Sequence, residues 1–362
     1  MSGKNILKEL DGFRVIAVFL VVSFHLSFYF NAIPGYNTII STGYLGVQLF
    51  FILSSFLLAR QFLGMYSAYS DKMVYILTFF KKRIYRIYPL FIFSSIILYV
   101  IGYAHPELSV FPIIKYLLFI EDIHINPVMW SLFVEMRFYL ILPFIMHVVC
   151  NLIIKNKISQ VYLFMGSIAA ISYIYRFSQL YFYGLEEGYD ILYNSFFANI
   201  DCLAVGIAGA VFYERNKHIE VNAKTLYFIL VSSFAVLFYA MHIKYNELFK
   251  HIYIPYAVFS ICNIAWTCAI VSLLLLKKSR LNKLFSLNIF VYLSTISYGI
   301  YMWHLPVKIY TYEVFSSYNL NGILVLIPPL STWIITLIVS LVCYKYLELP
   351  FLLKTRKVTN KI

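Results

Sequence analysis

Apolar residues along this chain occur in repeated blocks of about twenty, separated by short polar segments. A block of this length is enough for a helix to cross roughly 30 Å of bilayer hydrocarbon. Because backbone polar groups in lipid must be hydrogen-bonded internally, each block is predicted to be a helix. The predicted transmembrane helices are 12–30, 44–64, 88–104, 128–150, 160–180, 191–213, 224–243, 254–276, 287–308 and 323–345.

The segments between these blocks are short and suggest no separate soluble domain. Residues 111–120 are apolar but too few to cross a bilayer, so we expect a re-entrant or interfacial segment there. The fold class is therefore an all-α, polytopic integral membrane protein of about ten transmembrane helices. We expect residues 1–362 to form a single transmembrane domain with a basic cytoplasmic tail at about 346–362.

The composition agrees with a membrane protein, since 62% of residues are hydrophobic and only 12% are charged. With the N-terminus inside, ten spans place 22 of the 29 Lys and Arg residues on the cytoplasmic side. This positive-inside pattern predicts that both termini are cytoplasmic. It also makes the net charge of +13 a topology signal and argues against a nucleic-acid partner. The remaining basic residues are Lys115, Arg176, Lys244, Lys250 and Lys308 outside, with Arg14 and Arg137 within spans.

Two other readings of the chain are disfavoured by its composition. The first apolar block contains Arg14 and His25 and lacks a small-residue cleavage site, so it is not a cleavable signal peptide. The five cysteines lie in or beside spans, and no pair has metal-ligand spacing. We interpret the cysteines as packing residues and expect no metal.

Ionisable groups at bilayer depth are the first candidates for function, because placing them in lipid costs several kcal/mol. Arg14 and His25 are eleven residues apart, which brings them within about 20° of one helix face and roughly 16 Å apart along it. The functional interpretation makes His25 a general base, since its proton exchanges near neutral pH. The alternative is a structural His25 with an Arg14 that reaches lipid phosphates.

The fourth predicted span begins with Trp130 and Ser131 and carries Glu135 and Arg137. The two charged residues are two positions apart and point in different directions on a helix, so each needs a partner from another helix. Trp130 alone is typical of an interfacial anchor. Asp201, in the sixth span, is either half of a structural ion pair or a functional carboxylate.

Two further clusters allow both a structural and a functional interpretation. Arg83 and Arg86 share a helix face just before the third span, where they either anchor lipid headgroups or clamp a phosphate-rich ligand. In the ninth span, an aromatic belt explains Tyr298, Tyr301 and Trp303, but it does not explain His304, which is followed by Pro306.

These residues belong to a series of motifs that resembles the membrane-bound acyltransferase 3 family over nearly the whole chain. Each motif alone is weak, but seven occur in the order typical of the family. Ser55 stands where the family usually has glycine, which leaves the local helix packing open. The motifs are Leu10–Arg14 with His25, Gly46–Phe56, Lys82–Pro89, Trp130–Tyr139, Ile200–Gly206, Ser297–Pro306 and Tyr346–Phe351.

The resemblance implies a stand-alone enzyme of the bacterial cell (inner) membrane, without the fused extracellular domain of some relatives. Such an enzyme moves an acyl group, usually acetyl, from cytoplasmic acyl-CoA to a hydroxyl, often on a surface-polysaccharide sugar. Acetyl-CoA is then a donor substrate, and no permanently bound cofactor is expected. The implied site comprises His25, Glu135 and His304 as catalytic candidates, Arg14, Arg83 and Arg86 for the donor, and Trp130, Ser131, Asp201, Tyr298 and Glu348 as substrate-binding or structural polar residues.

The predicted chemistry uses His25 either as a general base on the acceptor hydroxyl or as a nucleophile that forms an acyl-imidazole. Glu135 either orients an imidazole or binds the acceptor. The main alternative is a transporter of a lipid-linked sugar or small solute, in which Arg, Glu and His would line the path. A second alternative is an acyltransferase whose acceptor is a small molecule.

Overall fold

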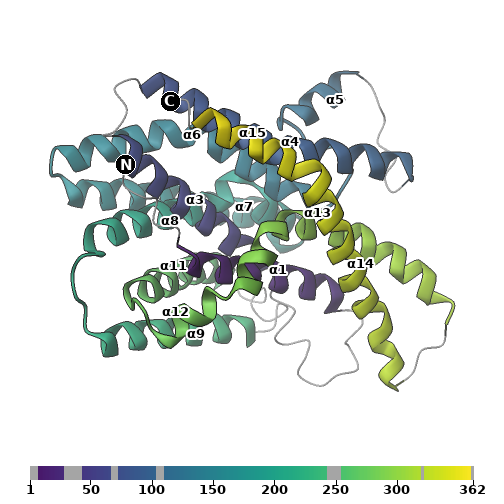
Figure 1. The fold of residues 1–362 in the computed structure, drawn as a ribbon. Coiled ribbons are helices and arrows are strands. Elements are labelled where there is room, and N and C mark those ends of the chain that lie inside the picture. The colour runs from purple at the N-terminus through teal and green to yellow at the C-terminus, as the bar shows by residue number, and fades with distance from the viewer. Residues whose placement is uncertain are drawn as a thin grey trace. The chain divides into compact units, whose positions relative to one another are not determined.

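The structure is a computed structural model that describes residues 7–27, 43–66, 72–102, 110–242, 254–318 and 322–359. Within these ranges all the regular secondary structure is helical (Figure 1). The longer helices are α1 (Glu9–Leu26), α3 (Tyr44–Tyr66), α4 (Lys72–Val100), α6 (Met129–Ile154), α7 (Ile158–Asn194), α8 (Phe196–Asn216), α9 (Ala223–His242), α11 (Ile254–Leu275), α13 (Asn288–Ser316) and α14 (Ile327–Cys343).

Eight helices within the described residues are long and apolar enough to cross a membrane. This confirms a polytopic helical membrane protein. The eight do not include α1 or α13, which correspond to the first and ninth predicted spans. Helix α1 carries three charged residues, Glu9, Asp11 and Arg14, within its 18 residues, and α13 is rich in tyrosine and serine. The count of ten spans and the cytoplasmic location of the termini stay predictions.

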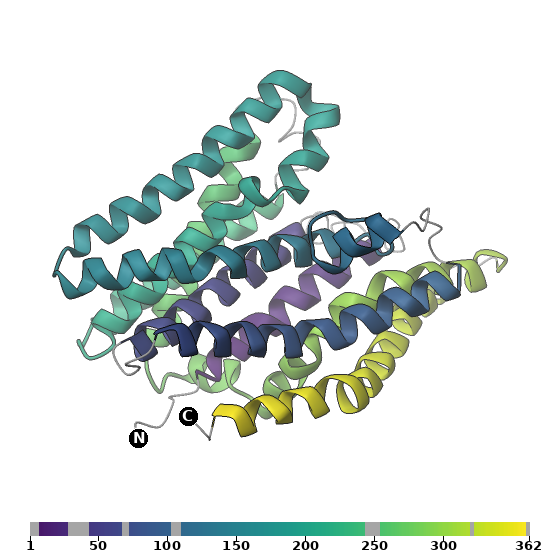
Figure 2. The ribbon, with the colours of Figure 1, turned by 90° about the horizontal axis from the view of Figure 1, so that it is seen from above.

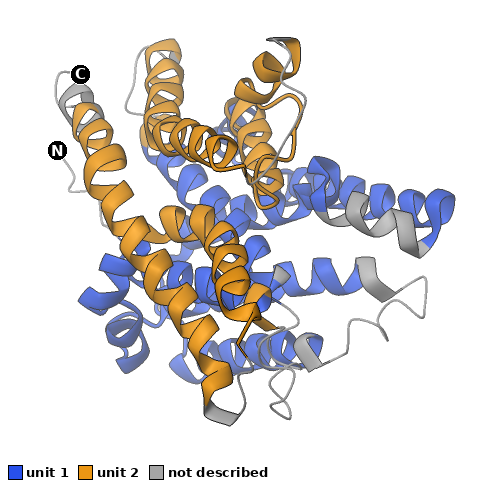
Figure 3. Cartoon of the chain, turned by 90° about the vertical axis from the view of Figure 1, so that its right-hand side faces the viewer, with its two compact units in different colours: residues 1–24, 35–64, 144–294 blue, residues 25–34, 65–143, 295–362 orange. Residues whose placement is uncertain are grey.

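The chain divides into two compact units, each assembled from separate stretches of sequence (Figure 3). Unit 1 contains residues 1–24, 35–64 and 144–294, and unit 2 contains 25–34, 65–143 and 295–362. One boundary falls within α1 and another within α6. That both units belong to one transmembrane domain stays a prediction.

In unit 1, α7 packs against α8, and α11 lies against α7, α8 and α9. Ser195 caps α8 by accepting a hydrogen bond from the Ala198 amide at 3.3 Å. Helix α7 is kinked at Gly184, whose φ of 70° is in the left-handed region that glycine tolerates best. The short helix α12 (Arg280–Phe285) is tied to the end of α11 through Asn282, which donates to the Leu273 carbonyl at 2.9 Å.

Unit 2 differs from the sequence prediction at two places. The predicted span 88–104 is the second half of the much longer α4, which also carries the basic cluster around Arg83. The described part of the predicted basic tail, up to residue 359, is helical, since α14 continues through a π-helical turn, Tyr344–Glu348, into α15 (Leu349–Thr359). Figure 2 shows α15 running beside α4, where the rings of Tyr85 and Phe351 are 6.0 Å apart.

The segment between α4 and α6 forms the short helix α5 (Val110–Leu117), as expected for an apolar piece too short to span. It packs on α4 through the hydroxyls of Ser95 and Tyr116, which are 2.8 Å apart. Tyr88 donates to the Leu117 carbonyl at 2.9 Å. Helix α5 is therefore packed on α4 within unit 2.

The serine that replaces the family's usual glycine is accommodated by a second glycine. Ser55 is fully buried in α3 and donates to the Ile52 carbonyl at 3.0 Å. A Cβ added to Gly206 of α8 would lie 1.9 Å from Ser55 Oγ and 2.7 Å from the Ile52 carbonyl oxygen. The close approach of α3 and α8 thus survives because Gly206 leaves room for the hydroxyl.

Gly206→Ala is expected to lower the free energy of unfolding by about 1–3 kcal/mol, the usual range for overpacking a tight contact. The matched control is Gly166→Ala on α7, where an added Cβ meets no described atom within 4 Å. That control should be neutral or slightly stabilising, because alanine favours the helix. The stability of the two variants is compared by the detergent concentration at the midpoint of unfolding. Equal midpoints would contradict the packing role of Gly206.

Candidate active site

His25 and His304 form a direct hydrogen bond in unit 2. His25 Nδ1 and His304 Nε2 are 3.0 Å apart, and the ring centroids are 4.9 Å apart. Helix α1 ends at Leu26, four residues before the predicted end of the first span, so His25 lies in its last turn. The negative end of the helix macrodipole there stabilises the positive charge that develops when the imidazole takes a proton.

His304 is almost fully buried, with 1% of its surface exposed. Its Nδ1 lies 2.7 Å from the Tyr301 carbonyl oxygen and 3.2 Å from that of Ile300. Both carbonyls belong to the preceding turn of α13. The ring orientation of His304 is therefore set by its own helix, and His304 is a buried hydrogen-bond partner of His25.

Helix α6 presents a polar stripe, Ser131, Glu135 and Tyr139, at intervals of four residues. Ser131 Oγ lies 2.6 Å from the Tyr301 hydroxyl of α13. Glu135 accepts a hydrogen bond from Tyr139 one turn further on. The prediction that Glu135 takes a partner from another helix is therefore incomplete, because this partner comes from α6 itself. Arg137 donates to the carbonyl of Ile120 at 2.8 Å, so its partner lies outside α6 but in the segment that follows α5, not in another helix.

Arg83 lies beside the far end of this stripe. Its guanidinium carbon is 5.6 Å from the Tyr139 ring centroid and 5.9 Å from that of Phe79, which are cation–π distances. Its Nε is buried and has no hydrogen-bond partner among the described residues. An unpaired buried N–H is costly, so this position favours an acceptor from a ligand.

Arg86 and Glu348 extend the same cluster. Arg86 lies one turn after Arg83 on the same face of α4, within electrostatic range of Tyr139, Tyr298 and Glu348. Glu348 is 3% exposed, closes the π-helical turn, and its Oε1 has no hydrogen-bond partner in the described part of the chain. Single π-helical turns occur often at functional sites. Tyr298 donates to the Ile87 carbonyl at 3.2 Å, which joins α13 to α4.

These residues make up what we call the polar column of unit 2. Tyr139 and Ser131 are eight residues apart on α6, or roughly 12 Å. Arg83 contacts the Tyr139 end, whereas Tyr301 and then His304 follow the Ser131 end. The column comprises Arg83, Arg86, Tyr139, Glu135, Tyr298, Ser131, Tyr301, His304 and His25.

Two predicted site residues, Arg14 and Asp201, are held in unit 1, and Trp130 lies half-buried in the first turn of α6. Arg14 forms an ion pair with Asp11 at 3.5 Å, and Asp11 in turn accepts from Ser294 at 2.6 Å. Arg14 thus shares α1 with His25, and its ion-pair partner is Asp11 of the same helix.

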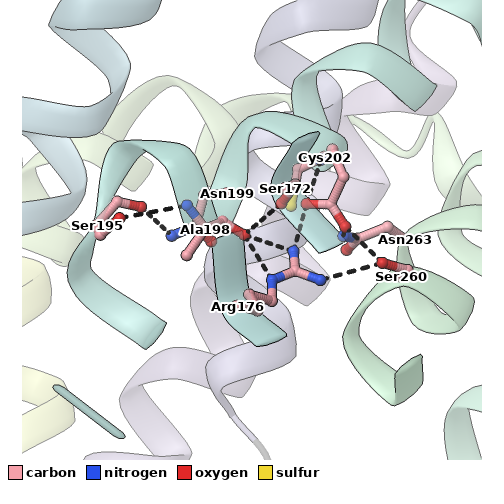
Figure 4. A network of polar contacts seen from close by, with 9 residues as sticks. Ser172, Arg176, Ser195, Ala198, Asn199, Cys202, Ser260 and Asn263 are labelled. Atoms are coloured by element: carbon pink, nitrogen blue, oxygen red, sulfur yellow. Dashed lines mark hydrogen bonds and ion pairs between the residues drawn. The ribbon is translucent and has the colours of Figure 1, made fainter. Parts of the chain in front are cut away.

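Asp201 forms a buried ion pair with Arg176 of α7, and each residue is 1% exposed (Figure 4). Its Oδ1 also accepts from the Cys202 amide at 2.9 Å, and its Oδ2 accepts from Ser260 at 2.8 Å and Asn263 at 3.1 Å. Arg176 further donates to the Ala198 carbonyl. Both Asp201 oxygens are thus engaged, which favours the structural alternative for this residue.

Arg176, which the sequence prediction counts among the external basic residues, lies within α7 with its side chain buried against the Ala198 carbonyl and Ser260. The side of the membrane on which Arg176 lies stays a prediction. Sequence reasoning also did not select Tyr139 and Tyr301 as site residues. The spacing of four along α6 and of three between Tyr298, Tyr301 and His304 is the signal that identifies them.

A buried polar column that passes through several apolar helices is typical of a multi-pass membrane protein with an internal reaction or transport site. The acyltransferase domain of the acyltransferase 3 family matches residues 7–345. The chain therefore belongs to this family of membrane acyltransferases.

Curated relatives support the same assignment. The chain is 24% identical over 382 residues to the O-acetyltransferase OatA of Staphylococcus aureus strain NCTC 8325, which covers 97% of this chain and 58% of the relative. It is also 24% identical over 371 residues to a putative O-acetyltransferase of strain COL, with 94% and 56% covered. The chain thus spans little more than half the length of these relatives. No solved structure matches the chain.

Proposed function

We propose that this protein transfers an acyl group, specifically acetyl, from cytoplasmic acyl-CoA to a hydroxyl of a surface-polysaccharide sugar in a bacterial cell membrane. The observation that carries the proposal is the polar column, which has two arginines at one end and the hydrogen-bonded pair of His25 and His304 at the other. Both similar proteins are named O-acetyltransferases, which supports acetyl as the group and oxygen as the acceptor atom.

The arginine end suits the nucleotide part of CoA. CoA carries several phosphate charges, and guanidinium forks match phosphate oxygens geometrically. Arg83 offers a buried N–H without a partner among the described residues, and Arg86 adds a second cation. Glu348 offers a buried carboxylate oxygen that suits an amide N–H of the pantetheine arm. Arg14, which the sequence also assigns to the donor, belongs to unit 1, and its role stays a prediction.

The histidine end of the polar column suits the acyl-transfer reaction. The acceptor hydroxyl attacks the thioester carbonyl while His25 takes its proton, a new C–O bond forms, and the C–S bond breaks. The proton then passes from the imidazolium to the leaving CoA thiolate. In the other route His25 itself attacks and holds the acetyl group as an acyl-imidazole before transfer. Release of one equivalent of CoA without acceptor would indicate the second route.

Replacing both Arg83 and Arg86 by alanine is expected to weaken acetyl-CoA binding by at least about tenfold, since hydrogen bonds to charged groups contribute about 1.5–3 kcal/mol each. Calorimetric titration of purified protein with acetyl-CoA measures the effect. The matched control is Lys81→Ala, which removes an exposed charge of the same sign from the same helix and should leave the affinity within twofold. Unchanged affinity in the double variant would leave the arginines as lipid anchors.

The proposed function is tested by mass spectrometry of surface glycans from host cells with and without the gene. Loss of one acetyl mass on a glycan after deletion, restored by the wild-type gene, supports a polysaccharide acceptor. Unchanged glycans together with an acetylated small molecule would favour the small-molecule alternative. If glycans and small molecules were both acetylated normally after deletion, and the purified protein did not bind acetyl-CoA, the transporter alternative would be favoured.

A further inference from the structure

We propose that His304 is a positioning residue that holds His25 in one tautomer, with the proton on Nδ1 and the lone pair on Nε2. The inference rests on the proposed function only in assigning the reaction to His25. It separates the two histidines of the pair into a reacting imidazole and a supporting one, and it follows from their hydrogen-bond partners.

The first step is the tautomer of His304. A backbone carbonyl oxygen accepts hydrogen bonds and never donates them. His304 Nδ1 lies 2.7 Å from the Tyr301 carbonyl oxygen, so this nitrogen carries the proton. In a neutral imidazole the other nitrogen is then an acceptor. His304 Nε2 therefore presents a lone pair.

The second step is the tautomer of His25. Its Nδ1 lies 3.0 Å from His304 Nε2, and a hydrogen bond between two neutral imidazoles needs one proton. Since His304 Nε2 is the acceptor, His25 Nδ1 is the donor. His25 Nε2 consequently carries the lone pair, as both a general base and a nucleophile require. The hydrogen bond on one ring nitrogen thus sets the reactivity of the other.

The third step is what fixes His304 itself. Pro306 has no N–H, so the carbonyl of Met302, four residues earlier in α13, loses its helical partner. Asn126, which is fully buried, donates to that carbonyl at 2.9 Å. On the neighbouring residue, the Tyr301 hydroxyl is held by Ser131. The helical turn that precedes His304 is therefore anchored by side chains from outside α13.

The arrangement argues against His304 as the base. One of its nitrogens is bonded to its own helix, the other to His25, and only 1% of its surface is exposed. Accepting a proton from a substrate would require His304 to leave one of these bonds. In the general-base route, His25 keeps its Nδ1–H bond to His304 whether its Nε2 is neutral or protonated.

The tautomer is tested directly in the resting protein with ¹⁵N-labelled histidine. The nitrogen shifts of His25, assigned by comparison with His25→Gln, should show a protonated Nδ1 and an unprotonated Nε2. In His304→Leu the preference should be lost, because the acceptor is gone. A proton on Nε2 of His25 in the wild-type protein would overturn the inference. This measurement involves no turnover, so failure of the proposed function appears separately, as unchanged glycan acetylation after gene deletion.

Activity provides the second readout. Glutamine places its side-chain oxygen near the position of the imidazole Nε2, so His304→Gln retains an acceptor, whereas His304→Leu does not. We expect transfer by the Gln variant within about tenfold of wild type and a loss of roughly 100-fold in the Leu variant, the low end of what a misplaced base forfeits. Acetyl-CoA binding should be unchanged in both. Equal losses in the two variants with binding intact would overturn the inference, and so would full activity of the Leu variant.

Discussion

His25→Ala and His25→Gln should each lower acetyl transfer by at least about 100-fold, because general acid–base catalysis commonly contributes 10²- to 10⁴-fold. Glutamine keeps much of the shape of the imidazole and its amide can donate a hydrogen bond to His304 Nε2, but it cannot take up and release a proton. Both variants should therefore be inactive while binding acetyl-CoA normally. The measurement is transfer of radiolabelled acetyl from acetyl-CoA to glycan in membranes that contain each variant at equal abundance.

The matched control for His25 is His147→Gln. His147 is an exposed histidine on α6 whose Nε2 lies 3.0 Å from the Asn151 amide nitrogen, so the same substitution removes a second imidazole outside the polar column. Its transfer rate should stay within twofold of wild type. A His25→Gln variant that kept most of its activity would show that His25 is a structural or binding residue. The nucleophile and base roles would then have to be sought elsewhere in the polar column.

The parts of the fold that could be predicted from the sequence are those where apolar length alone decides. Helices α3, α9 and α11 lie within two residues of their predicted ends, because their apolar blocks are bounded by polar residues in the sequence. Helix α4 was predicted too short because hydropathy falls at its basic cluster, although charged side chains do not interrupt the backbone hydrogen bonds of a helix. The helix after α14 likewise continues through Lys345 and Glu348, because charged side chains lower the hydropathy but leave the backbone hydrogen bonds intact.

The candidate site shows a similar division. Single residues such as His25 and Glu135 stand out in the sequence because ionisable groups are rare at bilayer depth. Their pairing depends on how the last residues of α1 pack with the unit 2 parts of α6 and α13, which no spacing along the chain encodes. His25 and His304 are 279 positions apart, so no local motif contains both of them. The tautomer of His25 is accessible only once that contact is known.

The ion pair in unit 1 shows how an intramembrane charge can be structural. Arg176 and Asp201 are 25 positions apart, on neighbouring helices, and nothing in the sequence links them. Because α7 and α8 pack together, the pair satisfies two groups that would each be costly alone. Its loss should consequently affect stability before it affects the chemistry of His25.

Asp201→Ala is expected to lower the free energy of unfolding by about 3–5 kcal/mol, the usual effect of removing one partner of a buried pair. The substitution leaves the Arg176 guanidinium buried without its counter-charge and also deprives Ser260 and Asn263 of their acceptor. Titration of the purified protein with SDS in mixed micelles measures the change. Acetyl-CoA affinity, compared below the unfolding transition, should remain close to that of wild type.

Two comparisons separate the buried pair from ordinary charge loss. Glu121→Ala removes a largely exposed carboxylate whose pair with Lys115 spans 2.7 Å, and it should cost no more than about 1 kcal/mol. The double variant Arg176→Met, Asp201→Leu replaces both charges by apolar groups and should be more stable than Asp201→Ala, because no buried charge is left unpaired. If Asp201→Ala kept its stability and lost acetyl-CoA affinity or transfer instead, Asp201 would be a substrate-binding residue.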